Sequence, residues 1–378
     1  MIDRTLFNRE HCLFRDNLKR FLAREVLPYH PQWEEQGYVS REIWNRAGSE
    51  GFLCPSVPEE YGGSGGDQLF SIAVIEEIAI AGASGLGWSL HSDVVAPYIL
   101  SYGTEAQMKH YLPKMVRGEV VGAIAMTEPA AGSDLKGILT TARRVGDEYV
   151  VSGSKTFITN GLHCDLVILA VKTDSQDGAK GISLLLADAT LPGFSRGKLL
   201  KKSGMHALDT TELFFQDMRV PVSNLLGNEG QGFALLMQQL PWERLQAAIH
   251  SIASAEAALS LTIEYTKERH AFGRELLAFQ NTRFTLSELK AEVQIGRVFV
   301  DKCAELLLQG KLDTAVASMA KYWSTNLRFK VTDACVQLFG GYGYMRDFPI
   351  SHAWADAGIY RLAGGSNEIM KEVISRSL

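Results

Sequence analysis

The chain has 378 residues, of which 46% are hydrophobic and 21% are charged, and its formal net charge is −5 at pH 7. These values are typical of a folded chain with two or three domains, and they exclude an intrinsically disordered protein. Acidic and basic residues are interspersed, so nucleic acid is not an expected partner. Residues 1–10 contain no uninterrupted apolar run, so we expect neither a signal peptide nor a membrane span. A bacterial cytoplasmic protein is expected, or a mitochondrial matrix protein in a eukaryote.

The five cysteines are far apart in the chain and odd in number. Their neighbours are mostly apolar, so the pattern predicts reduced core residues, with no disulfide framework and no metal site. These residues are Cys12, Cys54, Cys164, Cys303 and Cys335.

Residues 1–119 have a helical pattern and form the first expected domain. Leu18, Phe21, Leu22 and Val26 recur at helical spacing. The segment 58–66 carries four glycines, but no lysine follows them at the spacing of a phosphate-binding loop. We therefore expect a flexible connection there, with Asp67 as the N-cap of the next helix.

Residues 120–228 change to short apolar runs with turn residues between them, which predicts a small antiparallel β domain. The Asn160-Gly161 pair follows one such run and is typical of a tight hairpin turn. The expected strands are Thr140–Val145, Tyr149–Ser152, Leu166–Val171, Ile182–Leu186 and Leu213–Phe215, after a first apolar run at 120–125.

The stretch Met126 to Asp134 reads M-T-E-P-A-A-G-S-D and follows the first apolar run. Pro129 ends regular strand pairing, and the small residues after it let another molecule approach the backbone. Thr127 and Ser133 add hydroxyl donors. The stretch can cradle a flat polar ring or a phosphate, although an ordinary turn has the same composition.

Residues 229–378 return to helix and form the third expected domain. Leu286, Leu289, Val293, Gly296 and Val300 repeat at alternating steps of three and four, as in the seam of a helical bundle. Glycine-rich segments at 339–344 and 363–368 interrupt this pattern.

Five motifs occur in order along the chain. T-E-P-A-A-G-S-D starts at Thr127, K-T-F-I-T-N-G at Lys155, R-H-A-F-G at Arg269, Q-L-F-G-G-Y-G at Gln337 and G-G-S-N-E-I-M at Gly364. Together they resemble the acyl-CoA dehydrogenase family over essentially the whole chain. This resemblance implies an α+β fold with an N-terminal helical domain, a middle antiparallel β domain and a C-terminal four-helix bundle.

The L-P-W-E-R-L segment at 240–245 resembles the long-chain branch of that family. The resemblance implies bound FAD, with some of its contacts crossing a subunit interface in a homotetramer built as a dimer of dimers. Phe157 stands where many relatives have tryptophan. The implied FAD-binding residues are Ile124, Ala125, Met126, Thr127, Gly132, Ser133, Phe157, Ile158, Thr159, Arg269, Phe272, Gln280, Gln337, Leu338, Phe339, Gly340, Gly341, Ser366, Asn367 and Glu368.

A carboxylate in a dry pocket can remove the weakly acidic proton next to a thioester, because burial raises its pKa. Glu243 lies in an apolar helical segment with Pro241 two residues before it. A glutamate in a helix is usually a solvated surface residue. The resemblance, however, matches Glu243 to the base of the long-chain branch, and Gly364 stands where medium- and short-chain relatives carry theirs. The substrate-contacting residues that it implies are Ser133, Pro241, Arg244, Gly364 and Gly365. For Arg244 a structural contact is the equal alternative.

The implied reaction is FAD-dependent dehydrogenation of a saturated acyl-CoA to the trans-2-enoyl-CoA. In it, Glu243 removes the α-proton and a hydride passes to flavin N5. Electron-transfer flavoprotein is the implied electron acceptor. Ala363 replaces a tyrosine of the relatives and Gly358 an arginine, while Gly82, Gly85 and Gly87 match the region lining the acyl tunnel. We therefore expect a medium to long or bulky acyl chain, unless Tyr360 or Arg361 fills the space.

Three alternatives remain open from the sequence. An acyl-CoA oxidase would share most of these residues and react with oxygen. A dehydrogenase of carrier-protein thioesters would also keep the glutamate. A non-enzymatic helical scaffold would bind no FAD.

Overall fold

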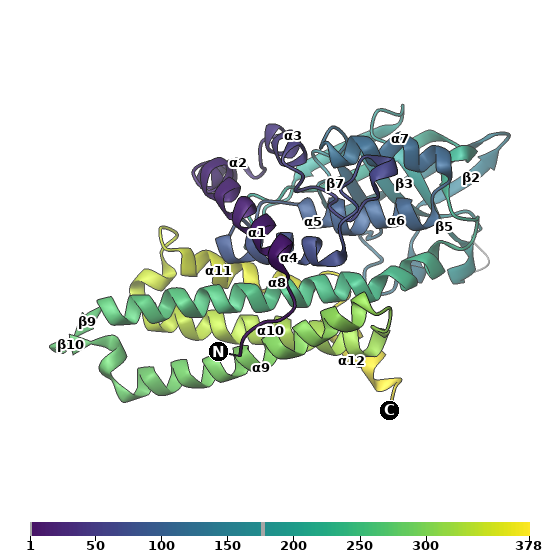
Figure 1. The fold of residues 1–378 in the computed structure, drawn as a ribbon. Coiled ribbons are helices and arrows are strands. Elements are labelled where there is room, and N and C mark those ends of the chain that lie inside the picture. Colours follow the sequence, from purple (N-terminus) through teal and green to yellow (C-terminus); the bar gives the residue numbers. More distant parts are fainter. Residues whose placement is uncertain (1, 175–177) are drawn as a thin grey trace.

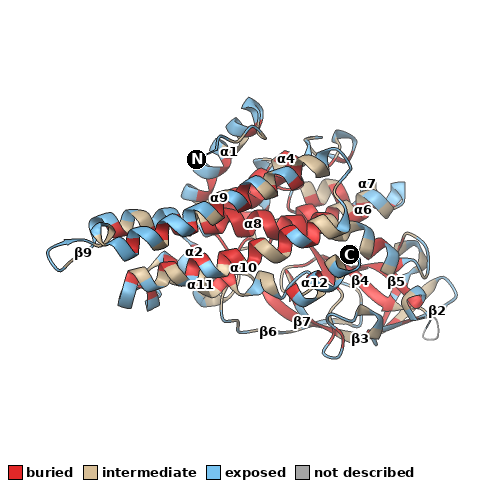
Figure 2. Ribbon diagram, turned by 90° about the horizontal axis from the view of Figure 1, so that it is seen from below, coloured by how far each residue is buried: buried red, intermediate tan, exposed pale blue. Residues whose placement is uncertain are grey.

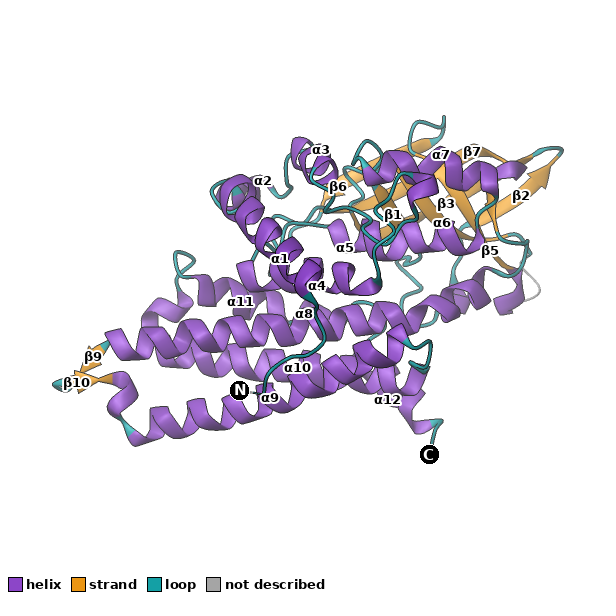
Figure 3. Ribbon diagram, in the orientation of Figure 1, coloured by secondary structure: helices purple, strands orange, loops and turns teal. Residues whose placement is uncertain are grey.

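A computed structural model describes residues 2–174 and 178–378. Figures 1 and 3 show a helical N-terminal part, a β sheet beside it and a bundle of long helices beneath both. The α+β fold expected from the sequence is confirmed.

The N-terminal part consists of helices that pack around aromatic and aliphatic side chains. Asp67 caps α4 by accepting a hydrogen bond from the Leu69 amide at 2.9 Å, as predicted. A π-helical turn, His91–Val95, joins α5 to α6. The helices are α1 (Arg9–Phe21), α2 (His30–Gln36), α3 (Glu42–Ser49), α4 (Gln68–Ala81), α5 (Trp88–Leu90), α6 (Ala96–Tyr102) and α7 (Glu105–Val116).

The glycine-rich loop before α4 is compact, and it differs from the flexible connection that we expected. The amide of Gly63 donates to the Pro58 carbonyl at 3.2 Å, and that of Gly65 to the Val57 carbonyl at 2.9 Å. A Cβ atom at Gly63 would lie 1.9 Å from the Val57 carbonyl oxygen. The glycine there permits a close backbone approach.

The middle part is a mixed sheet in the order β6-β7-β3-β2-β4-β5-β8, with β1 paired to β4. Most pairs are antiparallel, as predicted, but β1 and β2 each run parallel to β4. Two strands of this sheet were not predicted from the sequence: β6 has a half-exposed polar face, and β8 has only two residues. The strands are β1 (Gly122–Ala125), β2 (Thr141–Val145), β3 (Glu148–Thr159), β4 (Leu166–Lys172), β5 (Ile182–Asp188), β6 (Phe194–Leu199), β7 (Thr210–Pro221) and β8 (Leu225–Leu226).

The hairpin predicted at Asn160-Gly161 is absent, because β3 pairs with β2 and β7 and not with the following strand β4. Asn160 adopts a left-handed conformation with φ of 61°. Its side-chain amide donates to the carbonyls of Gly87 at 3.0 Å and Gly122 at 3.2 Å. Asn160 therefore joins the sheet to the N-terminal helices.

Three long helices and two shorter ones form the C-terminal part. The predicted seam is confirmed, since Leu286, Leu289, Val293, Gly296 and Val300 are all buried in α9. Figure 2 shows α8 as the most continuously buried helix, flanked by α9 and α10. The elements are α8 (Gly232–Glu268), α9 (Gln280–Leu308), α10 (Thr314–Phe339), α11 (Pro349–Ala357) and α12 (Asn367–Ser375), with a two-stranded tip, β9 (His270–Ala271) and β10 (Arg274–Glu275).

Among the described residues, no group of acidic, histidine and cysteine side chains could hold a metal ion. No helix in this part of the chain is long and apolar enough to cross a membrane. All five cysteines are free, but Cys12 is exposed. The prediction of a core position was therefore wrong for Cys12, which lies on the outer face of α1.

A buried ion network connects the N-terminal helices to the bundle. Arg297 of α9 donates to Glu76 of α4 at 2.6 Å and to Glu256 of α8 at 2.6 Å. Arg4 and Arg15 also bind Glu76. Removing one member of a buried network leaves uncompensated charge, which is more costly than breaking a surface pair.

We expect Arg297→Met to lower the free energy of unfolding by about 3 kcal/mol. The matched control on the same helix is Lys302→Met, which breaks an exposed pair with Glu305 and should cost about 0.5 kcal/mol or less. Urea unfolding of both variants measures the difference, and equal losses would contradict the role given to this network.

Candidate active site

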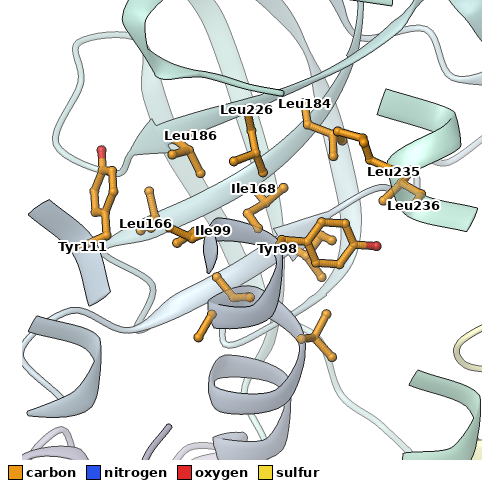
Figure 4. Close-up of a cluster of buried hydrophobic side chains, with 14 of the residues drawn as sticks. Tyr98, Ile99, Tyr111, Leu166, Ile168, Leu184, Leu186, Leu226, Leu235 and Leu236 are labelled. Carbon is orange, nitrogen blue, oxygen red and sulfur yellow. The ribbon is translucent and has the colours of Figure 1, made fainter. Parts of the chain in front are cut away.

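Glu243 lies on the side of α8 that faces α6. The Tyr98 hydroxyl donates to Oε1 of Glu243 at 3.0 Å. Figure 4 shows why Tyr98 is fixed, since its ring belongs to an apolar cluster made by α6, the sheet and the first turns of α8. Packing against the sheet therefore fixes the ring of Tyr98, and the hydrogen bond from Tyr98 fixes the carboxyl group of Glu243.

The surroundings of Glu243 change its acidity. Burial raises the pKa of Glu243 to about 7, and the hydrogen bond from Tyr98 and the charge of Arg244 only partly oppose this rise. A carboxyl group with this pKa can accept or release a proton near neutral pH. The position therefore suits a general base.

The turn of α8 that carries Glu243 is fixed by one residue before Glu243 and one after it. The indole of Trp242 and the amide of Gln246 both donate to the Asp93 carbonyl, at 2.8 and 3.0 Å. Pro241 lies inside the helix and is half-buried. These contacts orient Glu243 without involving its carboxylate.

Arg244 points away from Glu243 into the α8–α10 interface. Its side chain donates to the Ser318 hydroxyl at 3.0 Å, and the residue is 4% exposed. This contact matches the structural alternative for Arg244. The substrate contact that the resemblance implied remains a prediction.

The predicted glycine pair, Gly364 and Gly365, lies against the face of α10 that carries Lys321 and Thr325. Lys321 donates to the Gly365 carbonyl, and Asn367 exchanges hydrogen bonds with Thr325 at 3.0 and 3.2 Å. Gly364 has φ of 64° and open space where a Cβ atom would lie. The backbone of Gly364 is therefore accessible to a bound molecule.

The Met126–Ser133 segment is held more firmly than an ordinary turn. Buried Lys155 donates to the Met126 carbonyl at 3.0 Å and to Glu128 at 2.8 Å. Glu128 also accepts from the Thr140 amide at 3.0 Å, and the Thr156 amide donates to the Thr127 carbonyl at 2.9 Å. Neither Lys155 nor Glu128 was predicted to have a role, although both lie inside the motifs that start at Lys155 and Thr127.

This segment and the end of β3 fit a flat heteroaromatic group such as a flavin. Phe157 has φ of 58°, and its side chain is 68% exposed. Such exposure is unusual for an aromatic side chain beside a well-ordered loop. The hydroxyls of Thr127, Ser133 and Thr159 make no hydrogen bond within the described residues. Gly132 leaves open space beside them. An apolar face with free donors around it is therefore available, and Ile124, Ala125 and Ile158 form its buried support.

The remaining predicted cofactor residues lie elsewhere in the chain. Figure 1 shows the β9–β10 tip at the end of the bundle remote from the sheet. Arg269 lies there with its guanidinium 5.7 Å from the Tyr342 ring centroid, and Phe272 is 95% exposed. Gln280 begins α9 at this end. The last residues of α10 and the 3₁₀ turn after it also lie there, and they include Gln337, Leu338, Phe339, Gly340 and Gly341. Ser366, Asn367 and Glu368 start α12 beside the other part of α10. A single chain does not bring these groups together.

Two glycines expected to line an acyl tunnel have another role. A Cβ atom at Gly87 would lie 1.9 Å from Oδ1 of Asn160, and one at Gly85 would lie 2.5 Å from Cβ of Ala207. Both glycines allow the helices to approach the β domain closely. Gly82 faces open space.

Comparison with known proteins agrees with this arrangement. Family models match residues 8–119 (acyl-CoA dehydrogenase, N-terminal domain), 123–218 (middle domain) and 230–378 (C-terminal domain). The long-chain specific acyl-CoA dehydrogenase of Rattus norvegicus mitochondria is 47% identical, over 99% of this chain and 88% of that protein. The short-chain specific enzyme of Clostridium acetobutylicum is 38% identical, over 97% of each chain.

A crystal structure of an acyl-CoA dehydrogenase from Geobacillus kaustophilus superposes with a TM-score of 0.98 at 47% identity, covering 99% of each chain. The three matched domains and these relatives extend over nearly the full length. The chain belongs to the acyl-CoA dehydrogenase family of FAD-dependent oxidoreductases.

Proposed function

We propose that this chain oxidises the acyl group of a saturated acyl-CoA to the trans-2-enoyl-CoA, with Glu243 as the base. The observation that carries this proposal is the environment of Glu243. Its carboxyl group is held by Tyr98 at 3.0 Å, and burial raises its pKa to about 7.

The chemistry follows from this environment. The α-proton of a thioester is weakly acidic, and a carboxylate removes it most effectively when its own pKa is raised by a dry site. FAD, when bound, supplies the acceptor for the hydride that leaves the β-carbon. The accessible backbone amide at Gly364 is suited to hold the charge that develops on the thioester oxygen. Ser133, Pro241 and Gly365 are proposed to contact the substrate beside it.

The cofactor site that we propose uses two chains. Thr127, Ser133, Phe157 and Thr159 would hold the ring system, and Ser366 and Glu368 would approach it from the bundle. Arg269, Phe272, Gln280 and the 337–341 segment of a second chain would hold the adenine and the phosphates. The 95% exposure of Phe272 supports this division, because large apolar side chains at a tip usually meet a partner. This division requires at least a dimer, and the proposed assembly is the homotetramer that the family resemblance implies.

A medium to long or bulky acyl chain is the proposed substrate. The rat relative is named as long-chain specific. Both alternative fillers have other partners, which supports this proposal. The Tyr360 ring lies against His250 with ring centroids 4.6 Å apart, and the Arg361 guanidinium lies over Phe329. Electron-transfer flavoprotein is the proposed acceptor.

Anaerobic reduction of the bound FAD by acyl-CoAs of increasing length tests this function. We expect loss of the flavin absorbance near 450 nm, a wavelength that the flavin itself sets, with medium to long chains and little with C4. Bleaching by C4 alone would overturn the proposed chain length. FAD-containing protein that no acyl-CoA bleaches, but a loaded carrier protein does, would overturn the CoA assignment, and rapid reoxidation in air would indicate an oxidase.

Glu243→Gln is expected to remain yellow and to bind acyl-CoA, but to bleach at least 1,000-fold more slowly, because an amide cannot accept the proton. The matched control on the same helix is Glu264→Gln, which changes an exposed residue paired with Lys267. Stopped-flow absorbance at saturating substrate measures both. Near-normal bleaching in Glu243→Gln would assign the base to another residue.

Tyr98→Phe is expected to raise the pKa of Glu243 further, because it removes a hydrogen bond to the carboxylate form. Bleaching requires the carboxylate, so its rate should rise with pH through about 7 in the wild type. In Tyr98→Phe the midpoint should lie roughly 1 pH unit higher. Tyr102→Phe is the control, since Tyr102 bonds to Gln238 and not to Glu243. Coincident midpoints in all three proteins would contradict this role of Tyr98.

A further inference from the structure

Three cationic side chains are buried at the α8–α10 interface without an acidic partner. Lys321 is 0% exposed, Arg328 is 3% exposed and Arg244 is 4% exposed. None of them forms an ion pair with a carboxylate in the described part of the chain, and the charges of Glu368 and Asp356 act on Lys321 and Arg328 only from beyond ion-pair distance. Other buried cations differ, since Lys155 pairs with Glu128 at 2.8 Å and Arg297 with Glu76 at 2.6 Å.

Two of these cations support the segment 360–367, which we call the glycine loop. Residues 321, 325 and 328 share one face of α10, because they are four and then three positions apart. Lys321 donates to the Gly365 carbonyl. The Arg328 guanidinium lies 5.4 Å from the Tyr360 ring centroid, and its Nη1 lies 3.2 Å from Nδ1 of His250.

Support of the loop alone does not require these charges. Thr325 and Asn367 hold the C-terminal end of the same loop with neutral hydrogen bonds. The cationic contacts are unfavourable in the free chain, since burial lowers the pKa of Lys321 to about 8 and also lowers the pKa of Arg328. The Nε atom of Arg328 has no hydrogen-bond partner. Buried charge of this kind usually has a counter-charge.

The reaction proposed above supplies a counter-charge, and the present inference rests on that function. Before turnover the negative charge is on the Glu243 carboxylate. The α-proton then moves to Glu243, and the hydride moves from the β-carbon to the cofactor. Glu243 becomes neutral, and the reduced cofactor gains the negative charge. The net charge of the site is unchanged, but its location moves from α8 to the cofactor.

We propose that Lys321 and Arg328 are positioning residues of the glycine loop whose unpaired positive charge stabilises the reduced, anionic cofactor relative to the oxidised one. Their effect reaches the cofactor through the Gly364–Glu368 backbone that they support, and through the field of two cations in a poorly solvated interface. They are not catalytic residues, because nothing here puts them in contact with the reacting atoms.

The reduction potential of bound FAD distinguishes this role from a purely structural one. By thermodynamic linkage, the potential depends on the ratio of affinities for reduced and oxidised cofactor. If a substitution only loosens the loop, the protein loses affinity for oxidised and reduced FAD equally, and the reduction potential of bound FAD does not change. If the substitution removes a charge that stabilises the reduced form, the protein loses more affinity for reduced FAD than for oxidised FAD, and the potential falls.

Lys321→Met removes the charge and keeps the length of the side chain. We expect the two-electron equilibrium between bound FAD and a reference dye to shift at least tenfold toward oxidised FAD, which corresponds to a potential about 30 mV lower. Lys321→Arg keeps the charge and should restore most of this shift. The matched control is Lys202→Met, because half-buried Lys202 also donates to a backbone carbonyl, that of Leu208, and has no acidic partner among the described residues.

Arg328→Gln provides a second test, because it removes the charge and keeps a side-chain N–H donor. It decides the question if Lys321→Met holds FAD too weakly. A severalfold shift in the same direction is expected. Potentials of Lys321→Met and Arg328→Gln equal to that of Lys202→Met would overturn the inference while leaving the proposed function intact. Wild-type protein unable to bind FAD would instead overturn the proposed function.

Discussion

The burial of α8 between α4 and α10 is the constraint on which the rest of the structure depends. Its central turns are rich in alanine and serine, and Ala248, Ser251 and Ala255 are almost fully buried, so neighbouring helices can approach closely. A helix packed in this way has few positions for a charged group. Glu243 occupies one of them, at the part of α8 that contacts α6. Tyr98 of α6 and the sheet behind it cover the carboxyl group of Glu243 from that side. The unusual acidity of Glu243 is therefore a consequence of how the domains pack.

Much of the fold follows from local patterns, and the errors have specific physical causes. The seam of α9 and most strands were predicted, because their burial repeats with a regular period. Strand β3 is longer than expected, because polar Lys155 points toward a buried carboxylate, that of Glu128, which the pattern does not reveal. The hairpin at Asn160 failed for a similar reason, since its side chain bonds to Gly87, 73 residues away. Gly63 was expected in a flexible connection, and Gly85 and Gly87 were matched to the acyl-tunnel region, but a Cβ atom at any of the three would collide with a neighbouring residue.

The site was only partly predictable. Glu243 was chosen as the candidate base through family resemblance, because a glutamate in a helix gives no local sign of its surroundings. Its partner Tyr98 is 145 residues away, and the partner of Gly365, Lys321, is 44 residues away. Neither tyrosine nor lysine has a local signature for such a contact. The two groups of predicted FAD residues were each recognisable from motifs, but their separation along the bundle required the three-dimensional arrangement.

Some buried cations of this chain form ion pairs with acidic residues, and others do not. Arg297 and Lys155 are matched by acidic residues of the same chain, and their networks join elements that must not move. Both lie outside the α8–α10 interface. At that interface the chain provides cations and hydroxyl groups. The carboxylates of Glu368 and Asp356 act on Lys321 and Arg328 without forming ion pairs with them. A counter-charge fixed in the protein would compete with any negative charge that the reaction produces, because attraction to one carboxylate weakens the field felt by another group. Leaving Lys321 and Arg328 unpaired thus lowers the stability of the free chain while keeping their field directed at the glycine loop.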